Sequence, residues 1–95
     1  MEQVNIRIGH ITFDHADYDA GNDVLYLHVG KPQEAEGEEI PEGHVLRYAP
    51  DSQRIVGLTV LGAKRLQHRE RELRVTIPEP VKASADDLAP VLAAV

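Results

Sequence analysis

The chain has 95 residues, no cysteine and a formal net charge of −6 at pH 7. The absence of cysteine excludes disulfides, thiol chemistry and cysteine-ligated zinc, and the negative charge argues against nucleic-acid binding, because phosphate contacts require a basic surface. The length predicts one domain, residues 1–95, whose small core a homodimer would extend.

The first residues, Met1–Asn5, lack the basic start and the apolar stretch of a signal peptide. No run approaches the roughly eighteen continuous apolar residues of a membrane-spanning helix, and we therefore expect a cytoplasmic protein. Alternating apolar side chains predict two short strands over residues 4–8 and 11–13. Gly9 and His10 separate them, which is typical of a hairpin, although a single bent strand has the same pattern.

Residues 14–23 are acidic and rich in turn formers, so we expect an irregular turn there. The apolar run 24–29 follows abruptly and predicts a buried strand, with Leu25, Leu27 and Val29 on one face. Aromatic residues are rare and the other apolar residues are mainly aliphatic, which favours an antiparallel sheet as the core.

Residues 30–43 are polar and acidic, and we expect a surface loop there, because this composition cannot form a core. Two further apolar runs, 44–48 and 55–61, predict a hairpin around a turn at Pro50. Gly57 lies in the middle of the second run, which indicates a bulge or the close approach of another group.

The basic segment 63–71 has Leu66 as its sizeable apolar anchor, and we expect one short helical turn there. The alternation of apolar and polar residues over 73–77 predicts a last strand. We expect Pro78 and Pro80 to end this strand, because proline cannot donate a backbone hydrogen bond to a sheet.

Ser84 is the candidate N-cap of a C-terminal helix, and Pro90 indicates either a kink or a later start. Apolar residues recur there at the spacing of one helical face, at Leu88, Val91, Leu92 and Val95. The order of elements predicts an α+β fold, an antiparallel sheet of five or six strands with one C-terminal helix packed on one face.

Three segments carry a family resemblance: Tyr18-Asp19, then Asp23-Val24-Leu25-Tyr26-Leu27, then Arg54-Ile55-Val56-Gly57-Leu58. In this order and at this spacing they resemble the small YuzE-like bacterial domains of unknown function. The resemblance covers roughly residues 11–80 and implies a compact antiparallel sheet with a helix. It implies no catalytic residue, and it leaves the N-terminal segment 1–10 unexplained.

Several histidine and aspartate side chains are candidates for a metal site. Hairpin pairing could bring His15 or Asp17 close to His28, and His44 begins a later strand. A mixed set of imidazoles and carboxylates suits zinc, nickel or manganese. No fixed metal-binding spacing is present, however, and ordinary surface histidines explain the same residues.

Other kinds of site fare less well. The acidic residues 17–23 fail the calcium-binding EF-hand pattern, because Asn22 and His28 stand where glycine and glutamate are required. Asp and Asn side chains that bond to nearby backbone N–H groups explain this segment better. Ser52 and Ser84 lie at a turn and at the predicted cap, and the sequence has no phosphate-binding loop. We therefore assign no catalytic residue and no cofactor.

We expect a protein that acts by association rather than by catalysis. Open sheet edges invite a second copy of the chain, which predicts a homodimer. The acidic charge also suits a small basic protein partner, as in an antidote that binds a toxin. The alternative is a metal- or small-molecule-binding protein, catalytic or not, built on the histidine and aspartate candidates.

Overall fold

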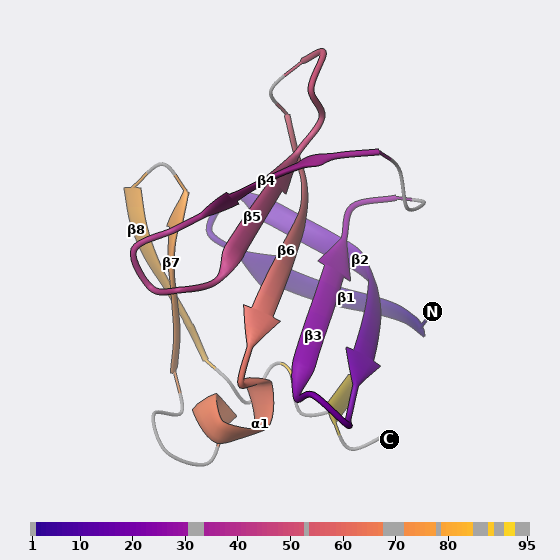
Figure 1. The fold of residues 1–95 in the computed structure, drawn as a ribbon, viewed down its shortest axis with the longest axis vertical. Coiled ribbons are helices and arrows are strands. Elements are labelled where there is room, and N and C mark those ends of the chain that lie inside the picture. Colours follow the sequence, from indigo (N-terminus) through magenta and orange to yellow (C-terminus); the bar gives the residue numbers. More distant parts are fainter. Residues whose placement is uncertain are drawn as a thin grey trace.

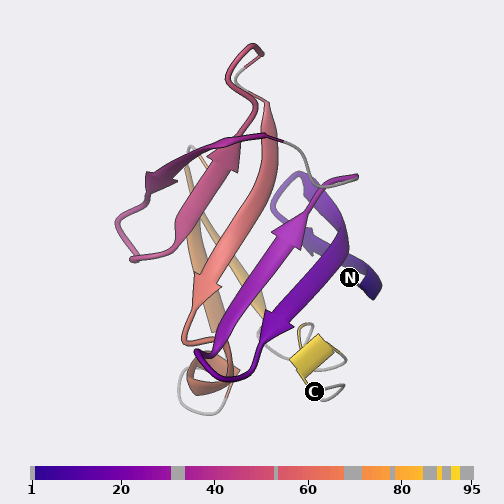
Figure 2. The same cartoon turned by 45° about the vertical axis from the view of Figure 1, so that its right-hand side comes forward.

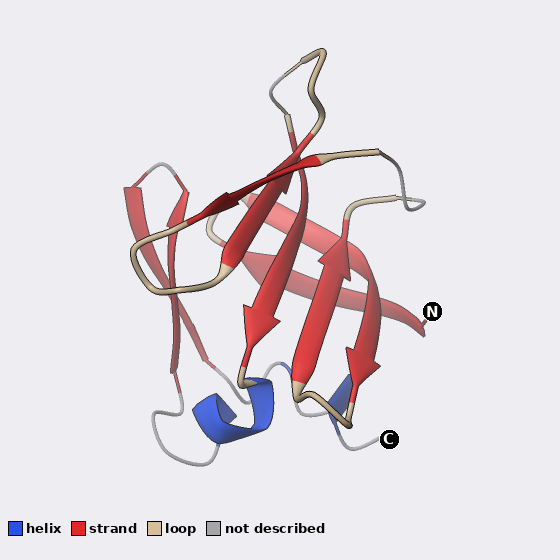
Figure 3. Cartoon of the chain, viewed as in Figure 1, coloured by secondary structure: helices blue, strands red, loops and turns tan. Residues whose placement is uncertain are grey.

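The computed structural model describes residues 2–30, 34–52, 54–67, 72–77, 79–84, 88 and 91–92. Strands dominate this part of the chain, and its helical segments are short (Figure 3). Within the same residues, no helix combines the length and the apolar character that crossing a membrane requires.

The main sheet has six strands in the order β1-β2-β3-β6-β5-β4 (Figure 1). In chain order they are β1 (Glu2–Ile8), β2 (Ile11–Asp19), β3 (Val24–His28), β4 (Glu36–Glu39), β5 (Val45–Tyr48) and β6 (Ile55–Leu61). Each pair of neighbours is antiparallel. The predicted antiparallel sheet of five or six strands is therefore confirmed, and β1 and β4 are its edges.

The N-terminal runs form the predicted hairpin, so the segment that the resemblance left unexplained supplies an edge strand. Ile6 pairs with Phe13, and Ile8 pairs with Ile11. The register shifts between Gln3 and Ile6, and a bulge of this kind bends a strand and increases its twist. Both views show β2 as a long curved strand between β1 and β3 (Figures 1 and 2).

Two segments that we predicted to be irregular contain strands instead. Residues 14–19 continue β2, which pairs with β3 as far as Asp19 opposite Val24. The acidic segment 30–43 contains β4, which pairs with β5, and Ile40 is buried beside it. These predictions are wrong because cross-strand pairing overrides the weak β propensity of Asp, Glu and Gly.

Gly57 marks both a register shift and a close approach, as predicted. The pairing of β5 with β6 changes register between Arg47 and Tyr48. A Cβ atom on Gly57 would lie 2.9 Å from the backbone oxygen of Leu27 on β3. Any larger residue at this position would therefore push two central strands apart.

The chain after β6 departs from the prediction at one point. The expected helical turn is α1 (Ala63–Arg65), and the expected strand is β7 (Glu72–Ile77). The chain then continues into β8 (Glu79–Ser84), which pairs with β7 as a separate hairpin (Figure 1). The predicted strand therefore ends at Ile77, immediately before Pro78, as expected, but it is not the last strand of the chain. Pro80 lies within β8, opposite Thr76, in a sheet of two strands where proline at an edge is tolerated.

The predicted C-terminal helix falls mostly outside the described residues. Ser84 ends β8, and residues 85–87 and Val95 are not described, so the N-cap at Ser84 stays a prediction. The apolar residues that are described are all buried in the core, as the helical spacing predicted: Leu88, Val91 and Leu92.

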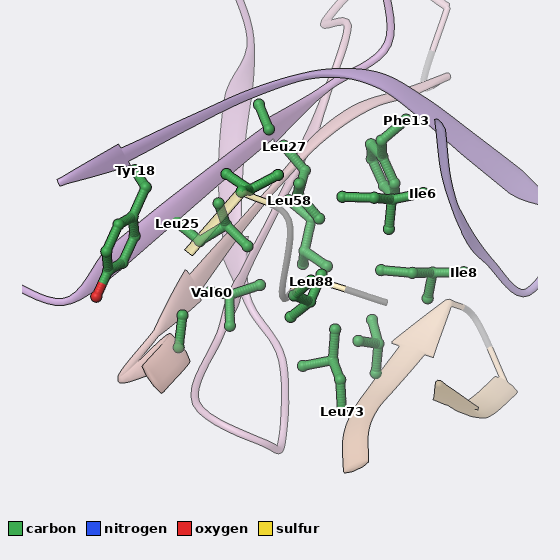
Figure 4. Close-up of a cluster of buried hydrophobic side chains, with 14 of the residues drawn as sticks. Ile6, Ile8, Phe13, Tyr18, Leu25, Leu27, Leu58, Val60, Leu73 and Leu88 are labelled. Carbon is green, nitrogen blue, oxygen red and sulfur yellow. The ribbon is translucent and has the colours of Figure 1, made fainter. Parts of the chain in front are cut away.

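The core lies on one side of the sheet (Figure 4). Buried side chains from the sheet, the β7–β8 hairpin and the C-terminal residues meet there, including Phe13, Leu25, Leu27, Leu58, Val60, Leu73 and Leu88. Along β3 and β6 these core residues alternate with Tyr26, His28, Gly57 and Thr59, which therefore belong to the opposite side. We call this opposite side of β2, β3, β6, β5 and β4 the outer face.

Candidate functional site

A register row crosses the outer face from β2 to β4. His15 pairs with His28, His28 pairs with Gly57, and Gly57 pairs with Arg47. Arg47 in turn pairs with Gly37 on β4. We call these five positions the histidine–arginine row. The two glycines in it, Gly57 and Gly37, have no side chain and flank Arg47 on both sides.

The structure brings together three of the four predicted metal candidates. His15 and His28 are cross-strand partners. Asp17 lies two residues further along β2, opposite Tyr26, and its charge acts on His28. These three side chains therefore share the outer face, as the predicted hairpin pairing required.

His44 does not join them. It is buried, and its Nδ1 atom accepts the backbone N–H of Leu61 at 3.1 Å. Leu61 is about 13 Å along β6 from Gly57, the neighbour of the other histidines. Among the residues that the structure describes, no group of three or more His, Cys, Asp or Glu side chains is arranged to hold a metal ion. The metal site stays a prediction, and His44 lies apart from its other members.

A pocket of about 270 Å³ lies over the middle of the histidine–arginine row. It is lined by Tyr26, His28, Ala35, Arg47, Val56 and Gly57. A Cβ atom built on Gly57 would have the Cβ and Cδ atoms of Arg47 at 3.6 and 3.7 Å, so the aliphatic stem of the arginine lies beside the bare glycine. One sequence signal pointed to this pocket, the glycine in the middle of an apolar strand.

The pocket carries a positive charge at neutral pH. Burial lowers the pKa of His28, the charge of Arg47 lowers it further, and Asp17 acts in the opposite direction. The imidazole of His28 is therefore neutral at pH 7. Among the described residues, the guanidinium of Arg47 has no hydrogen-bond or ion-pair partner.

Two carboxylates of β2 hold neighbouring loops. Asp14 accepts the backbone N–H of Gly30 at 2.7 Å and shares a hydrogen bond of 2.8 Å with the Nδ1 atom of His15. Asp19 accepts the side-chain and backbone N–H groups of Asn22 at 2.8 and 3.3 Å, which confirms the predicted turn. The bond with His15 lowers the pKa of Asp14, and the side-chain bond with Asn22 lowers the pKa of Asp19. A general acid requires a raised pKa, so neither carboxyl suits that role.

A third carboxylate joins the β2–β3 turn to α1. The hydroxyl of Tyr18 donates to Oδ1 of Asp23 at 2.5 Å, and the backbone N–H of Lys64 donates to the same oxygen at 2.9 Å. The backbone oxygen of Asp23 accepts the N–H groups of Gly62 at 2.8 Å and Ala63 at 3.3 Å. Asp23 has a φ of 53°, a left-handed conformation that aspartate tolerates better than most residues. We call this set of hydrogen bonds the Tyr18–Asp23 latch.

The pKa values of Tyr18 and Asp23 keep the latch in one protonation state near neutral pH, as suits a structural contact. Burial, followed by the bond to Asp23, raises the pKa of Tyr18 to about 12. Burial alone would raise the pKa of Asp23, but the N–H of Lys64, the hydroxyl of Tyr18 and the N–H and charge of Arg65 outweigh it and lower that pKa. A neutral phenol thus donates to a carboxylate at every pH between the lowered pKa of Asp23 and the raised pKa of Tyr18. We did not predict this latch from the sequence, although both residues belong to the motif that carried the resemblance.

A family model matches residues 15–64, and its description is a protein of unknown function (DUF2283). The match runs from the middle of β2 to α1 and includes both partners of the latch and the whole pocket lining. Searches of the curated proteins and of the solved structures found no match.

Proposed function

The chain belongs to the DUF2283 family of proteins of unknown function, and we propose that it is a non-catalytic binding module whose edge strand β4 pairs with a basic strand of a protein partner. The closer kinship with YuzE-like domains is part of the same proposal and rests on the three segments that carry the resemblance. The observation that carries the proposed function is the open, acidic edge at β4.

Among the residues that the structure describes, the backbone of β4 is paired on one side only. β4 is the last strand in the sheet order, and β5 is its neighbour on the other side. All four of its residues are exposed. An unpaired edge of this kind can accept a further strand through main-chain hydrogen bonds.

The side chains of β4 select the charge of the added strand. Glu36, Glu38 and Glu39 are exposed, and Gly37 is the remaining residue. Opposite charges on neighbouring strands stabilise a sheet, whereas like charges directly opposite each other destabilise it. A partner strand rich in Lys or Arg therefore suits this edge, and its association would be accelerated by the negative charge of the whole chain.

The same glutamates weigh against the homodimer that the sequence predicts, where it forms through β4. Antiparallel pairing of two copies of β4 would set the glutamates of one chain against those of the other. Charged residues at an edge are a common protection against such self-pairing. We therefore propose a basic partner, rather than a second copy, as the occupant of this edge.

The proposal of a non-catalytic role rests on what the acidic residues of the site do. Asp14, Asp19 and Asp23 each accept hydrogen bonds that hold loops or turns together. Their lowered pKa values keep them ionised and leave no proton for general-acid catalysis near neutral pH.

A synthetic peptide can stand in for the basic strand of the partner. We expect a six-residue peptide of alternating Lys and Val to bind the full chain, with amide chemical-shift changes concentrated in β4 and with affinity that falls as salt rises. A peptide with Glu in place of Lys should not bind. The substitution Glu38→Lys should weaken binding of the basic peptide, because it replaces an attraction by a repulsion at the edge.

The matched control is Asp51→Lys, which changes the net charge equally but lies in the turn between β5 and β6. It should leave binding nearly unchanged. Equal weakening by Asp51→Lys and Glu38→Lys would mean that the peptide senses overall charge and not the edge. Equal binding of the acidic peptide, or no binding of the basic one, would also contradict the proposal.

A further inference from the structure

We propose that the pocket on the outer face binds a small organic anion that joins a carboxylate to a flat ring. The pocket is separate from the β4 edge in its chemistry: it offers a side-chain cavity with a positive charge, where β4 offers backbone groups and negative charges. The two proposals can therefore succeed or fail independently.

The charge of the pocket selects the anion. Arg47 is half-buried in the pocket lining, and among the described residues its guanidinium has neither an ion-pair nor a hydrogen-bond partner. A guanidinium presents a planar fork of N–H groups that matches the two oxygens of a carboxylate. His28 beside it is neutral at pH 7, because burial and the charge of Arg47 lower its pKa. Arg47 is thus the one cationic side chain in the described lining, and a single positive charge suits a monoanion better than a dianion.

The shape of the pocket selects a flat group. Gly57 lies between His28 and Arg47 in the row and has no side chain to fill the space. Tyr26 and His28, whose rings lie on the outer face, form part of the same lining. Flat, partly apolar walls of this kind favour stacking with an aromatic ring.

Glycine is required at the centre of this arrangement for a structural reason as well. A Cβ on Gly57 would approach the backbone oxygen of Leu27 to 2.9 Å, so a larger residue at this position would force β3 and β6 apart. The volume of about 270 Å³ lies just below the usual range of ligand pockets, roughly 300–1,000 Å³. The ligand is therefore a small metabolite of one ring and one carboxylate rather than a nucleotide or a peptide.

Benzoate is the probe, because it combines a carboxylate with a flat ring. The carboxylate and the ring each have a control compound that lacks them. We expect saturable binding of benzoate to the full chain by NMR titration at pH 7.5, with shifts centred on His28, Arg47 and Gly57. Acetate lacks the ring and benzyl alcohol lacks the charge, and both should bind more weakly. Inorganic phosphate tests whether a dianion occupies the same place, and it should also bind more weakly.

Substitution of the arginine gives the decisive comparison. Arg47→Met keeps the aliphatic stem beside Gly57 and should weaken benzoate binding by about tenfold or more, because a charge-assisted hydrogen bond is lost. Arg47→Lys keeps the positive charge but loses the planar pair of N–H groups, so its affinity for benzoate should lie between those of the wild type and Arg47→Met. Arg54→Met is the matched control, because Arg54 is exposed and lies outside the pocket lining.

Three results would overturn the proposal. They are no saturable benzoate binding by the folded wild-type chain, benzoate binding that a folded Arg47→Met variant retains, and benzyl alcohol binding as tightly as benzoate. Tighter binding of phosphate than of benzoate would also overturn it, by replacing the flat carboxylate with a dianion. Far-UV circular dichroism establishes that each variant is folded.

Discussion

The substitution Leu58→Ala is expected to lower the free energy of unfolding by about 2–5 kcal/mol, which is the usual range for loss of a buried leucine side chain. Leu58 is completely buried and lies on β6, with β3 and β5 on either side. The substitution removes apolar contacts and leaves a cavity at the centre of the sheet. For a domain of this size the loss is a large part of the total stability, which is typically about 5–15 kcal/mol.

Leu61→Ala is the matched control on the same strand. Leu61 is 44% exposed, so the same chemical change should cost well under half as much. Urea or thermal unfolding followed by circular dichroism measures both variants. Equal losses for Leu58→Ala and Leu61→Ala would contradict the assignment of the core to one side of β6.

The substitution Asp23→Ala is expected to destabilise the fold by about 2–4 kcal/mol, because it removes a charged acceptor from the Tyr18–Asp23 latch. The hydroxyl of Tyr18 and the N–H of Lys64 would both lose their partner. Alanine also tolerates the left-handed backbone of this position less well than aspartate. Asp23→Asn keeps an oxygen acceptor and the left-handed conformation, and it should cost less than alanine does.

Asp19→Ala is the matched control, since it removes an aspartate from the same turn but only an exposed bond to Asn22. It should cost clearly less stability than Asp23→Ala does. Urea unfolding measures these variants under the same conditions as wild type. A loss for Asp19→Ala as large as that for Asp23→Ala would mean that the turn as a whole, and not the latch, carries the stability.

The latch also predicts a pH dependence. The pKa of Asp23 is lower in the folded chain than its ordinary value of 3.8. The stability that Asp23 contributes through ionisation is therefore fully present above pH 3.8 and is lost as the pH falls through the lowered folded value. The difference in stability between wild type and Asp23→Ala should accordingly shrink below that pH. A difference that stays constant from pH 7 to pH 2 would contradict the charged state of the latch.

The strands with strong alternation were predictable from the sequence, and the acidic ones were not. Leu25 and Leu27 are separated by one residue in an apolar run, and this spacing alone predicted that both lie in the core. β4 has the sequence Glu-Gly-Glu-Glu, which has low β propensity, and its pairing with β5 sets its structure. The continuation of β2 through residues 14–19 was not predicted for the same reason, a low β propensity: polar side chains of the outer face interrupt the apolar pattern there.

The candidate sites were predictable only where local pairing decided them. His15, Asp17 and His28 share a face because the β2–β3 hairpin is short, and the sequence favours that hairpin. The distance of His44 from these residues could not be predicted, because it depends on the pairing of β3 with β6, which are far apart in the chain. The pocket combines residues of β3, β5 and β6, which are far apart in the sequence. The unusual glycine at position 57 was therefore the one local pattern that pointed to it.

The open edge at β4 is the central claim, and native-state hydrogen exchange of the backbone amides tests it most directly. In the free chain, amides of β3 and β6 should exchange slowly, because both strands have neighbours on two sides. The amides of β4 that point away from β5 should exchange orders of magnitude faster and should become protected when the basic peptide binds. Amides of β4 protected as strongly as those of β6 in the free chain, or unchanged by the peptide, would contradict this account.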